Sequence, residues 1–166
     1  MAAAQLWEYV NQTAFLDYMA WEALASHVDG YINTRNWRLF VNGKTFKMEW
    51  VPSGADNTWH MDIDVFHGGI EGENAHALIW CFSLLSCRRA YAEYVLTTAD
   101  LVESMGLDQK FQEITSMLQP YIDKDPRAPF SDGEIENAQS TTLEIITLGP
   151  STAREQVYAE YPDLAP

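Results

Sequence analysis

The chain has 166 residues, of which 47% are hydrophobic and 13% aromatic, and its 24 acidic and 10 basic residues give a formal net charge of −14. This size and composition suit one domain, residues 1–166, with a hydrophobic core, and exclude a disordered acidic tail. The negative charge argues against direct binding to nucleic acid or to an anionic membrane surface. It favours a partner with a basic surface.

The spacing of the two cysteines and the absence of targeting signals indicate a reducing, cytoplasmic compartment. No apolar run reaches the ~20 residues that cross a bilayer, and the N-terminus lacks a signal-type pattern. Cys81 and Cys87 fall within one predicted helix, at a spacing that turns their side chains well away from each other. We therefore predict reduced thiols and a cytoplasmic protein.

The first element predicted is a single long helix. Apolar side chains recur every three or four positions from Trp7 to Val28, which is typical of a helix with one buried face, and Gly30 is a plausible stop. Acidic residues of this stretch lie mostly beside or opposite the apolar stripe. The sequence therefore predicts an amphipathic helix over residues 7–28.

A hairpin and a third strand are predicted next. Asn42-Gly43 is a strong signal for a two-residue turn, which would pair Val41 with Lys44 and Trp37 with Met48. After a turn at 52–57, residues 58–66 alternate between apolar and polar side chains. We therefore predict a three-stranded antiparallel meander with one dry and one wet face.

The second half of the chain is predicted to be mainly helical. A long central helix is expected from residue 74 to Gly106, with a break near Thr97 as an alternative, followed by a shorter helix that Pro120 halts. Residues 123–140 have the composition of an acidic, mobile loop. The β-branched stretch 141–148 predicts a fourth strand, and a last helix follows it.

These elements predict an α+β fold: a helix, a three-stranded meander, a long helix, a shorter helix, one further strand and a C-terminal helix. Over roughly the first two-thirds, the order of elements loosely resembles that of secretion chaperones, although no specific motif supports the resemblance. It implies a dimer that holds an unfolded stretch of another protein. The last part departs from that family, because only one further strand is apparent.

One cluster has the composition of a metal site. His60, Asp62 and Asp64 alternate along the predicted third strand, and His67 follows it closely enough to fold back. Residues two apart on a strand share a face, so these nitrogen and oxygen atoms suit Zn, Mn or Fe. Alternatively, Asp62 and Asp64 compensate the basic side chains of Lys47 and Arg38 on the neighbouring strands.

Other catalytic signatures are absent from the sequence. There is no GxSxG motif, and the glycines at 68, 69 and 72 lack the lysine of a phosphate-binding loop. We therefore predict that the protein is not an enzyme and needs no cofactor. A divalent metal at His60–His67, serving a metal-dependent enzyme or sensor, is the alternative.

The charge pattern leads to the predicted function, which is protein binding. Long segments rich in acidic residues provide electrostatic complementarity to a basic, nucleic-acid-binding surface, as in inhibitors of the immunity or anti-defence kind. A secretion-type chaperone, a virion or assembly component, and a homodimer are the alternatives. The predicted partner-binding residues are Glu8, Asp17, Glu22, Asp29, Asp132, Glu134 and Glu136.

Overall fold

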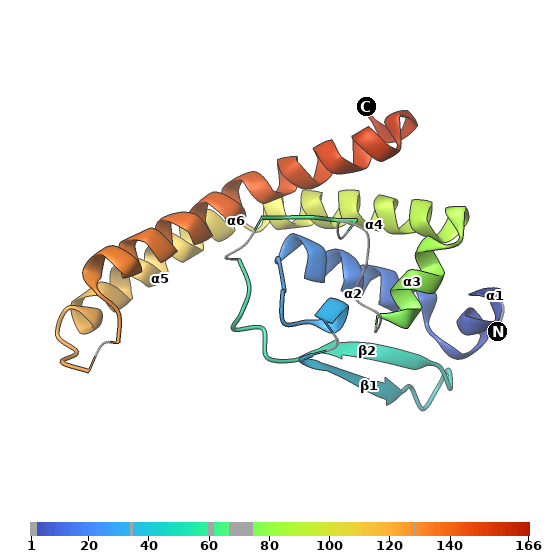
Figure 1. Cartoon of the computed structure of the whole chain (residues 1–166), viewed down its shortest axis with the longest axis horizontal. Coiled ribbons are helices and arrows are strands. Elements are labelled where there is room, and N and C mark those ends of the chain that lie inside the picture. Colours follow the sequence, from blue (N-terminus) through green and yellow to red (C-terminus); the bar gives the residue numbers. More distant parts are fainter. Residues whose placement is uncertain (1–2, 34, 60–61, 67–74, 128) are drawn as a thin grey trace.

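Helices dominate the computed structural model, which describes residues 3–33, 35–59, 62–66, 75–127 and 129–166 (Figure 1). The described residues form six α-helices and one two-stranded antiparallel sheet. The predicted three-stranded meander with a further strand is therefore wrong. The elements are α1 (Ala3–Tyr9), α2 (Gln12–Leu24), β1 (Trp37–Val41), β2 (Met48–Pro52), α3 (His76–Phe82), α4 (Leu85–Ser104), α5 (Leu107–Ile122) and α6 (Asp132–Glu160), with short 3-10 helices at Tyr31–Asn33 and Pro162–Leu164.

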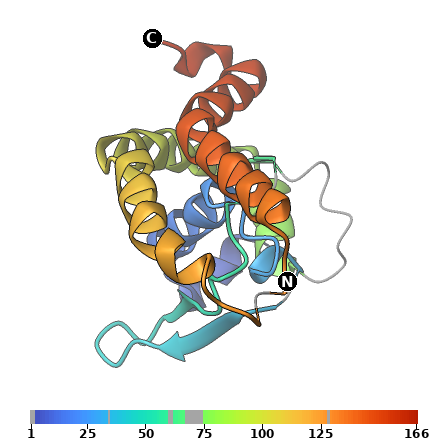
Figure 2. The same ribbon diagram turned by 90° about the vertical axis from the view of Figure 1, so that its left-hand side faces the viewer.

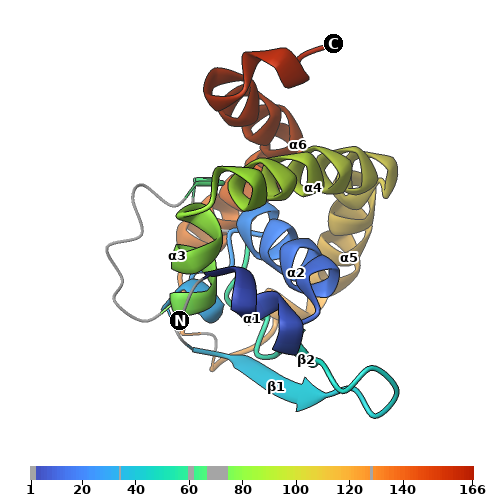
Figure 3. The same ribbon diagram turned by 90° about the vertical axis from the view of Figure 1, so that its right-hand side faces the viewer.

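The helices are arranged around α2. In Figures 1 and 3 the hairpin β1–β2 lies on one side of α2, and α4 and α6 lie on the other. The core forms where α2 meets α4, with Phe15 and Met19 of α2 and Tyr91 and Val95 of α4 fully buried. Figure 2 shows α5 running beside the first half of α6, away from this core.

The predicted N-terminal helix is interrupted at Val10. This side chain is fully buried, and the residue forms a parallel bridge with Met48 of β2. The backbone N–H of Asn11 then donates to the Met48 carbonyl at 3.0 Å, and the Asn11 side chain accepts from the N–H of Ala14 at the start of α2. Pairing with the sheet therefore divides the helix into α1 and α2.

The predicted hairpin is confirmed, but its register is wrong. Val41 pairs with Met48 and Trp37 with Pro52, so residues 42–47 form a longer loop than the predicted turn. This register lets the rings of Trp37 and Trp50 stack, with centroids 6.4 Å apart, and both rings pack against Tyr31. The contact with Tyr31 favours the observed pairing over the tighter turn.

Where a third strand was predicted, residues 62–66 run without strand partners. The predicted alternation is nevertheless present, because Ile63 and Val65 are buried whereas Asp62 and Asp64 are exposed. The alternation alone does not make a strand. A strand also needs hydrogen bonds to a neighbouring backbone, and here the side chains of Gln156 and Tyr91 make the bonds to the segment instead.

The predicted loop at 123–140 and the predicted strand at 141–148 are replaced over residues 132–160 by α6. Its first turn has a capping box, in which the Ser131 side chain accepts from the Glu134 N–H and Glu134 bonds back to Ser131. Its buried positions are Ile146, Gly149, Pro150, Ala153 and Val157, which recur at helical spacing against α4. This packing outweighs the strand preference of the β-branched residues.

The predicted central helix consists of α3 and α4, which are separated at Ser83 and Leu84, and α4 runs through Thr97 without a break. Because the chain turns there, Cys81 and Cys87 approach to a Cα–Cα distance of 5.1 Å and form a disulfide. The prediction of reduced thiols is wrong, since it assumed one continuous helix. Within the described ranges, no helix has both the length and the apolar character needed to cross a membrane.

Candidate functional site

A cavity of about 240 Å³ lies between the segment that follows α2 and residues 62–64. Its apolar wall includes Ala23, Val28 and Ile32. Its polar wall contains carboxylates, an amide, an imidazole and a hydroxyl, supplied by Glu22, Ser26, His27, Asn33, Asp62 and Asp64. Functional groups that lie far apart in the sequence therefore converge on one small cavity, which is the usual form of a ligand site.

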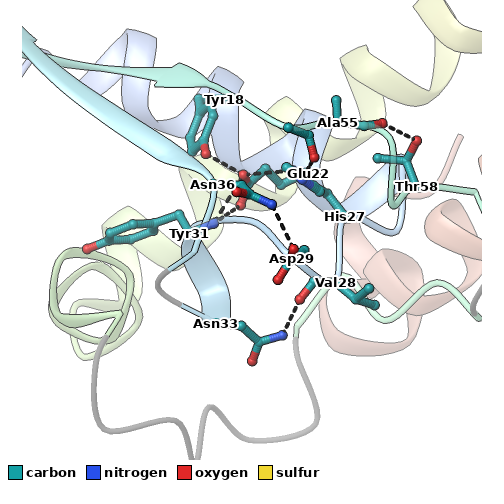
Figure 4. Close-up of polar contacts among 11 residues, drawn as sticks. Tyr18, Glu22, His27, Val28, Asp29, Tyr31, Asn33, Asn36, Ala55 and Thr58 are labelled. Carbon is teal, nitrogen blue, oxygen red and sulfur yellow. Dashed lines mark hydrogen bonds and ion pairs between the residues drawn. The ribbon is translucent and has the colours of Figure 1, made fainter.

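The segment after α2 is organised by the buried carboxylate of Glu22, which is 3% exposed (Figure 4). The hydroxyl of Tyr18, one turn earlier on α2, donates to Glu22 Oε1. The backbone N–H of Tyr31 donates to Oε2 at 2.9 Å, and Nδ1 of His27 lies 3.2 Å from Oε1. One carboxylate thus joins α2 to both ends of residues 27–31.

Gly30 is required by this arrangement. A Cβ atom at residue 30 would lie only 2.6 Å from the carboxylate carbon of Glu22, which is closer than real Cβ contacts. The chain therefore needs a glycine here in order to pass over the buried carboxylate. The predicted helix stop at Gly30 is wrong, because α2 already ends at Leu24 and Gly30 lies in the segment beyond it, where its role is close packing.

Burial also changes the protonation behaviour of the cluster. Removal from water raises the pKa of Glu22 above its ordinary value, although the hydrogen bond from Tyr18 and the imidazole of His27 offset part of that effect. Burial, together with the negative charge of Glu22, raises the pKa of Tyr18. Tyr18 consequently keeps its proton and serves as a donor.

On either side of Gly30, the segment carries the half-buried Asp29 and the exposed Asn33. The carboxylate of Asp29 accepts from Nδ2 of Asn36 at 2.7 Å and pairs with Arg35 at 3.3 Å. The Asn33 side-chain amide donates to the carbonyl of Val28, which fixes the side chain beside the cavity. Both side chains are therefore oriented before any ligand binds.

The opposite wall, residues 62–65, is held by side chains of α6 and α4. Oε1 of Gln156 accepts from the N–H of Val65 at 2.9 Å, and Nε2 of Gln156 donates to the carbonyl of Ile63 at 2.7 Å. The Tyr91 hydroxyl donates to the Val65 carbonyl at 2.7 Å. Burial, assisted by the charge of Asp64, raises the pKa of Tyr91, so its hydroxyl remains a donor.

The structure places half of the predicted metal cluster in this cavity. Asp62 and Asp64 line it, whereas His60 and His67 lie outside the described residues. The alternative explanation, compensation of Lys47 and Arg38 across a sheet, lacks the third strand on which it depends, and Lys47 donates to the carbonyl of Trp7. Within the described ranges, no three His, Cys, Asp or Glu side chains gather as a metal site.

The predicted partner-binding residues divide into two groups. Glu22 is buried and cannot belong to an exposed acidic surface, and Asp29 is partly covered. The others are exposed on α1, α2 and the first turns of α6: Glu8, Asp17, Asp132, Glu134 and Glu136. Their role in binding stays a prediction.

Sequence reasoning missed the roles of Glu22, Asn33, Tyr91 and Gln156. A signal for Glu22 exists, because it follows Tyr18 of the apolar stripe by four positions and so lies on the same helix face. No local signal identifies Gln156, which is 91 residues from Val65. Such a contact appears only when α6 folds back along α4.

Comparison with known proteins identifies a family that this chain matches. The family described as "CotH kinase protein" matches residues 2–144, which is well over half of the chain. No curated protein and no solved structure matches it. The match includes the whole cavity wall from Glu22 to Asp64, and it overturns the prediction that the protein is not an enzyme, because the family is one of kinases. The chain belongs to the CotH kinase protein family.

Proposed function

We propose that this protein transfers a phosphoryl group from a nucleoside triphosphate to a hydroxyl group, with the chemistry at the cavity between residues 26–33 and 62–64. The observation that supports this most directly is the convergence of Asp62, Asp64 and Asn33 on one cavity. Membership of a family described as kinases supports this reaction class. Catalysis of phosphoryl transfer consists mainly of positioning and charge stabilisation, for which fixed oxygen ligands are suited.

The residues present fit a magnesium ion. Mg²⁺ prefers oxygen ligands and is usually bound through one or two carboxylates together with substrate phosphates and water. Asp62 and Asp64 provide two carboxylates, and Asn33 provides an amide oxygen that lines the same cavity. The bound ion would neutralise the charge of the phosphates, and these three side chains would hold it.

The segment that carries His27, Asp29 and Asn33 has the residue order of a kinase catalytic loop. In protein kinases an Asp of the H-R-D-x-x-x-x-N loop accepts the proton of the substrate hydroxyl, and the Asn binds metal. Here Asn33 follows Asp29 by four positions rather than five. We assign the proton-accepting role to Asp29, whose carboxylate is oriented by Asn36 and Arg35.

The predicted basic partner fits this activity as the acceptor of the phosphoryl group. The exposed acidic residues of α1, α2 and α6 would attract a basic protein towards the cavity by long-range electrostatics. The net charge of −14 supports this proposal. The inhibitory role inferred from the same charge stays a prediction without a supporting contact.

The test is a phosphoryl-transfer assay with Mg²⁺, labelled ATP and protamine as a basic acceptor protein. We expect transfer by the wild type and a loss of roughly 100-fold in Asp62→Asn and in Asp64→Asn, because each loses a charged ligand for the metal. Both side chains are exposed, so thermal unfolding should change little.

Asp56→Asn is the matched control, because it makes the same chemical change at an exposed turn residue that does not line the cavity. It should retain wild-type activity. A wild type that labels neither protamine nor itself, or Asp62 and Asp64 variants as active as wild type, would contradict the proposal.

A further inference from the structure

We propose that Gln156 is a positioning residue that orients Asp62 and Asp64 and thereby sets the metal affinity of the site. The proposal rests on the proposed function, because it assigns these two carboxylates to a metal. Gln156 lies beyond residues 2–144, the part of the chain that matches the family. The inference therefore comes from the contacts of α6 with the cavity wall.

The side chain of Gln156 replaces a neighbouring strand. In a parallel sheet, one residue accepts from an N–H and donates to a carbonyl that lie on either side of a single residue of the strand beside it. The amide of Gln156 makes the same pair of bonds, accepting from Val65 at 2.9 Å and donating to Ile63 at 2.7 Å. The two bonds lie on either side of Asp64, so they fix the backbone that carries its carboxylate.

Gln156 is itself held firmly. Its helix neighbours Ala153 and Val157 are fully buried in the core. Two turns earlier on the same helix face, a Cβ atom at Gly149 would overlap the Cδ1 atom of Ile63, so α6 also packs directly on the segment. Tyr91 of α4 bonds to the Val65 carbonyl from another side. The segment is thus attached to two helices of the core.

The attachment determines where the carboxylates point. Ile63 and Val65 face the core while Asp62 and Asp64 face outward, because neighbouring side chains of an extended segment lie on opposite sides. Without Gln156, the Val65 N–H and the Ile63 carbonyl lose their partners, and the segment can rotate. Loss of groups that orient metal ligands typically weakens metal binding by ~10–100-fold.

The experiment measures Mn²⁺ binding to the full chain by electron paramagnetic resonance, since Mn²⁺ accepts the same oxygen ligands as Mg²⁺. Gln156→Met keeps an unbranched side chain and removes both hydrogen bonds, and Gln156→Leu is a second variant. We expect Mn²⁺ affinity to fall by about tenfold in both. Hydrogen exchange at the Val65 amide should accelerate by a similar factor, because its acceptor is gone.

Two controls separate positioning from general stability. Gln139→Leu makes the same change on the half of α6 that lies against α5, where the Gln139 amide donates to Gln119 at 3.4 Å. Val157→Ala weakens the core next to Gln156 and leaves its hydrogen-bonding amide in place. Both should bind Mn²⁺ as the wild type does, although Val157→Ala should melt at a lower temperature.

The outcomes are distinguishable. If Asp64→Asn weakens Mn²⁺ binding while both Gln156 variants bind normally, the positioning role is wrong and the proposed function stands. Equal weakening by Val157→Ala and Gln156→Met would also overturn the positioning role, because loss of stability would then be the cause. If Asp64→Asn binds Mn²⁺ as tightly as the wild type, the metal site is wrong, and both proposals fail.

Discussion

Glu22 shows how one side chain can organise a site without exposing its own charge. The carboxylate lies in the core between α2 and the segment that follows, where it accepts from Tyr18 and from the Tyr31 backbone. Leaving these donors unpaired in the core would cost free energy, so the carboxylate and the segment stabilise each other. Because this buried contact fixes the backbone at Tyr31, it also positions the neighbouring residues Asp29 and Asn33.

The raised pKa of Glu22 predicts a pH dependence of stability. Because folding favours the neutral form of this carboxyl, its contribution is complete below about pH 4.5, the ordinary value, and is lost as the pH rises through the raised pKa. Each pH unit between these two values corresponds to about 1.4 kcal/mol.

The measurement is urea unfolding of the wild type and of Glu22→Gln between pH 4 and pH 8. The free energy of unfolding of the wild type minus that of the variant should decrease with rising pH, because the amide does not titrate. A difference that stays constant, or that increases with pH, would contradict the assignment.

Among the elements, the break between α3 and α4 has the largest consequence for the fold. Leu84 adopts an extended backbone, and the chain turns enough to bring Cys81 to Cys87. The disulfide therefore secures the junction at which α4, the helix packed against α2 and α6, begins. Disulfides are typical of oxidising compartments, in contrast to the predicted cytoplasmic location.

Removal of this disulfide should destabilise the protein moderately. The closed loop is short, so the entropy that the bridge removes from the unfolded chain corresponds to about 2 kcal/mol. We expect the double variant Cys81→Ser/Cys87→Ser to unfold at a correspondingly lower urea concentration.

Reductant provides the control for the disulfide. Dithiothreitol should lower the stability of the wild type to that of the double variant and leave the variant unchanged. A wild type whose unfolding curve does not respond to dithiothreitol, under conditions that leave no bridge detectable by mass, would show that the disulfide does not contribute.

At the scale of the whole molecule, acidic side chains are exposed on α1, α2 and α6, among other elements, around a core formed mainly by α2 and α4. Charges on the surface act over about one Debye length, ~8 Å at physiological salt, and so influence association more than the bound state. The charge therefore predicts how a basic acceptor reaches the cavity rather than how it is held there.

Charge reversal at Glu8, Asp17 and Glu136 should slow association with protamine. These side chains are exposed and lie on three different helices. At low salt the rate constant for association, measured by stopped flow, should fall by roughly tenfold, and the difference should vanish at high salt. The corresponding amide variants should give a smaller loss, and a loss that salt does not reduce would contradict electrostatic attraction.

The sequence by itself determined what depends on neighbours along the chain. It predicted the β1–β2 hairpin, and the alternation of Ile63 and Val65 with Asp62 and Asp64, because turn residues and side-chain periodicity are local properties. Two residues of the proposed site, Asp62 and Asp64, follow from that alternation. The order of His27, Asp29 and Asn33 and the net charge of −14 are likewise properties of the sequence alone.

The tertiary structure decided everything that depends on partners far along the chain. Residues 62–65 are not a strand because Gln156 and Tyr91 take the place of a neighbouring strand. Residues 141–148 are helical because they continue into the part of α6 whose Ala153 and Val157 pack in the core. The contact of the buried Glu22 carboxylate with Tyr31 and the disulfide between Cys81 and Cys87 form only in the folded chain. Such contacts join residues with no periodic relation in sequence, so only the packed fold decides them.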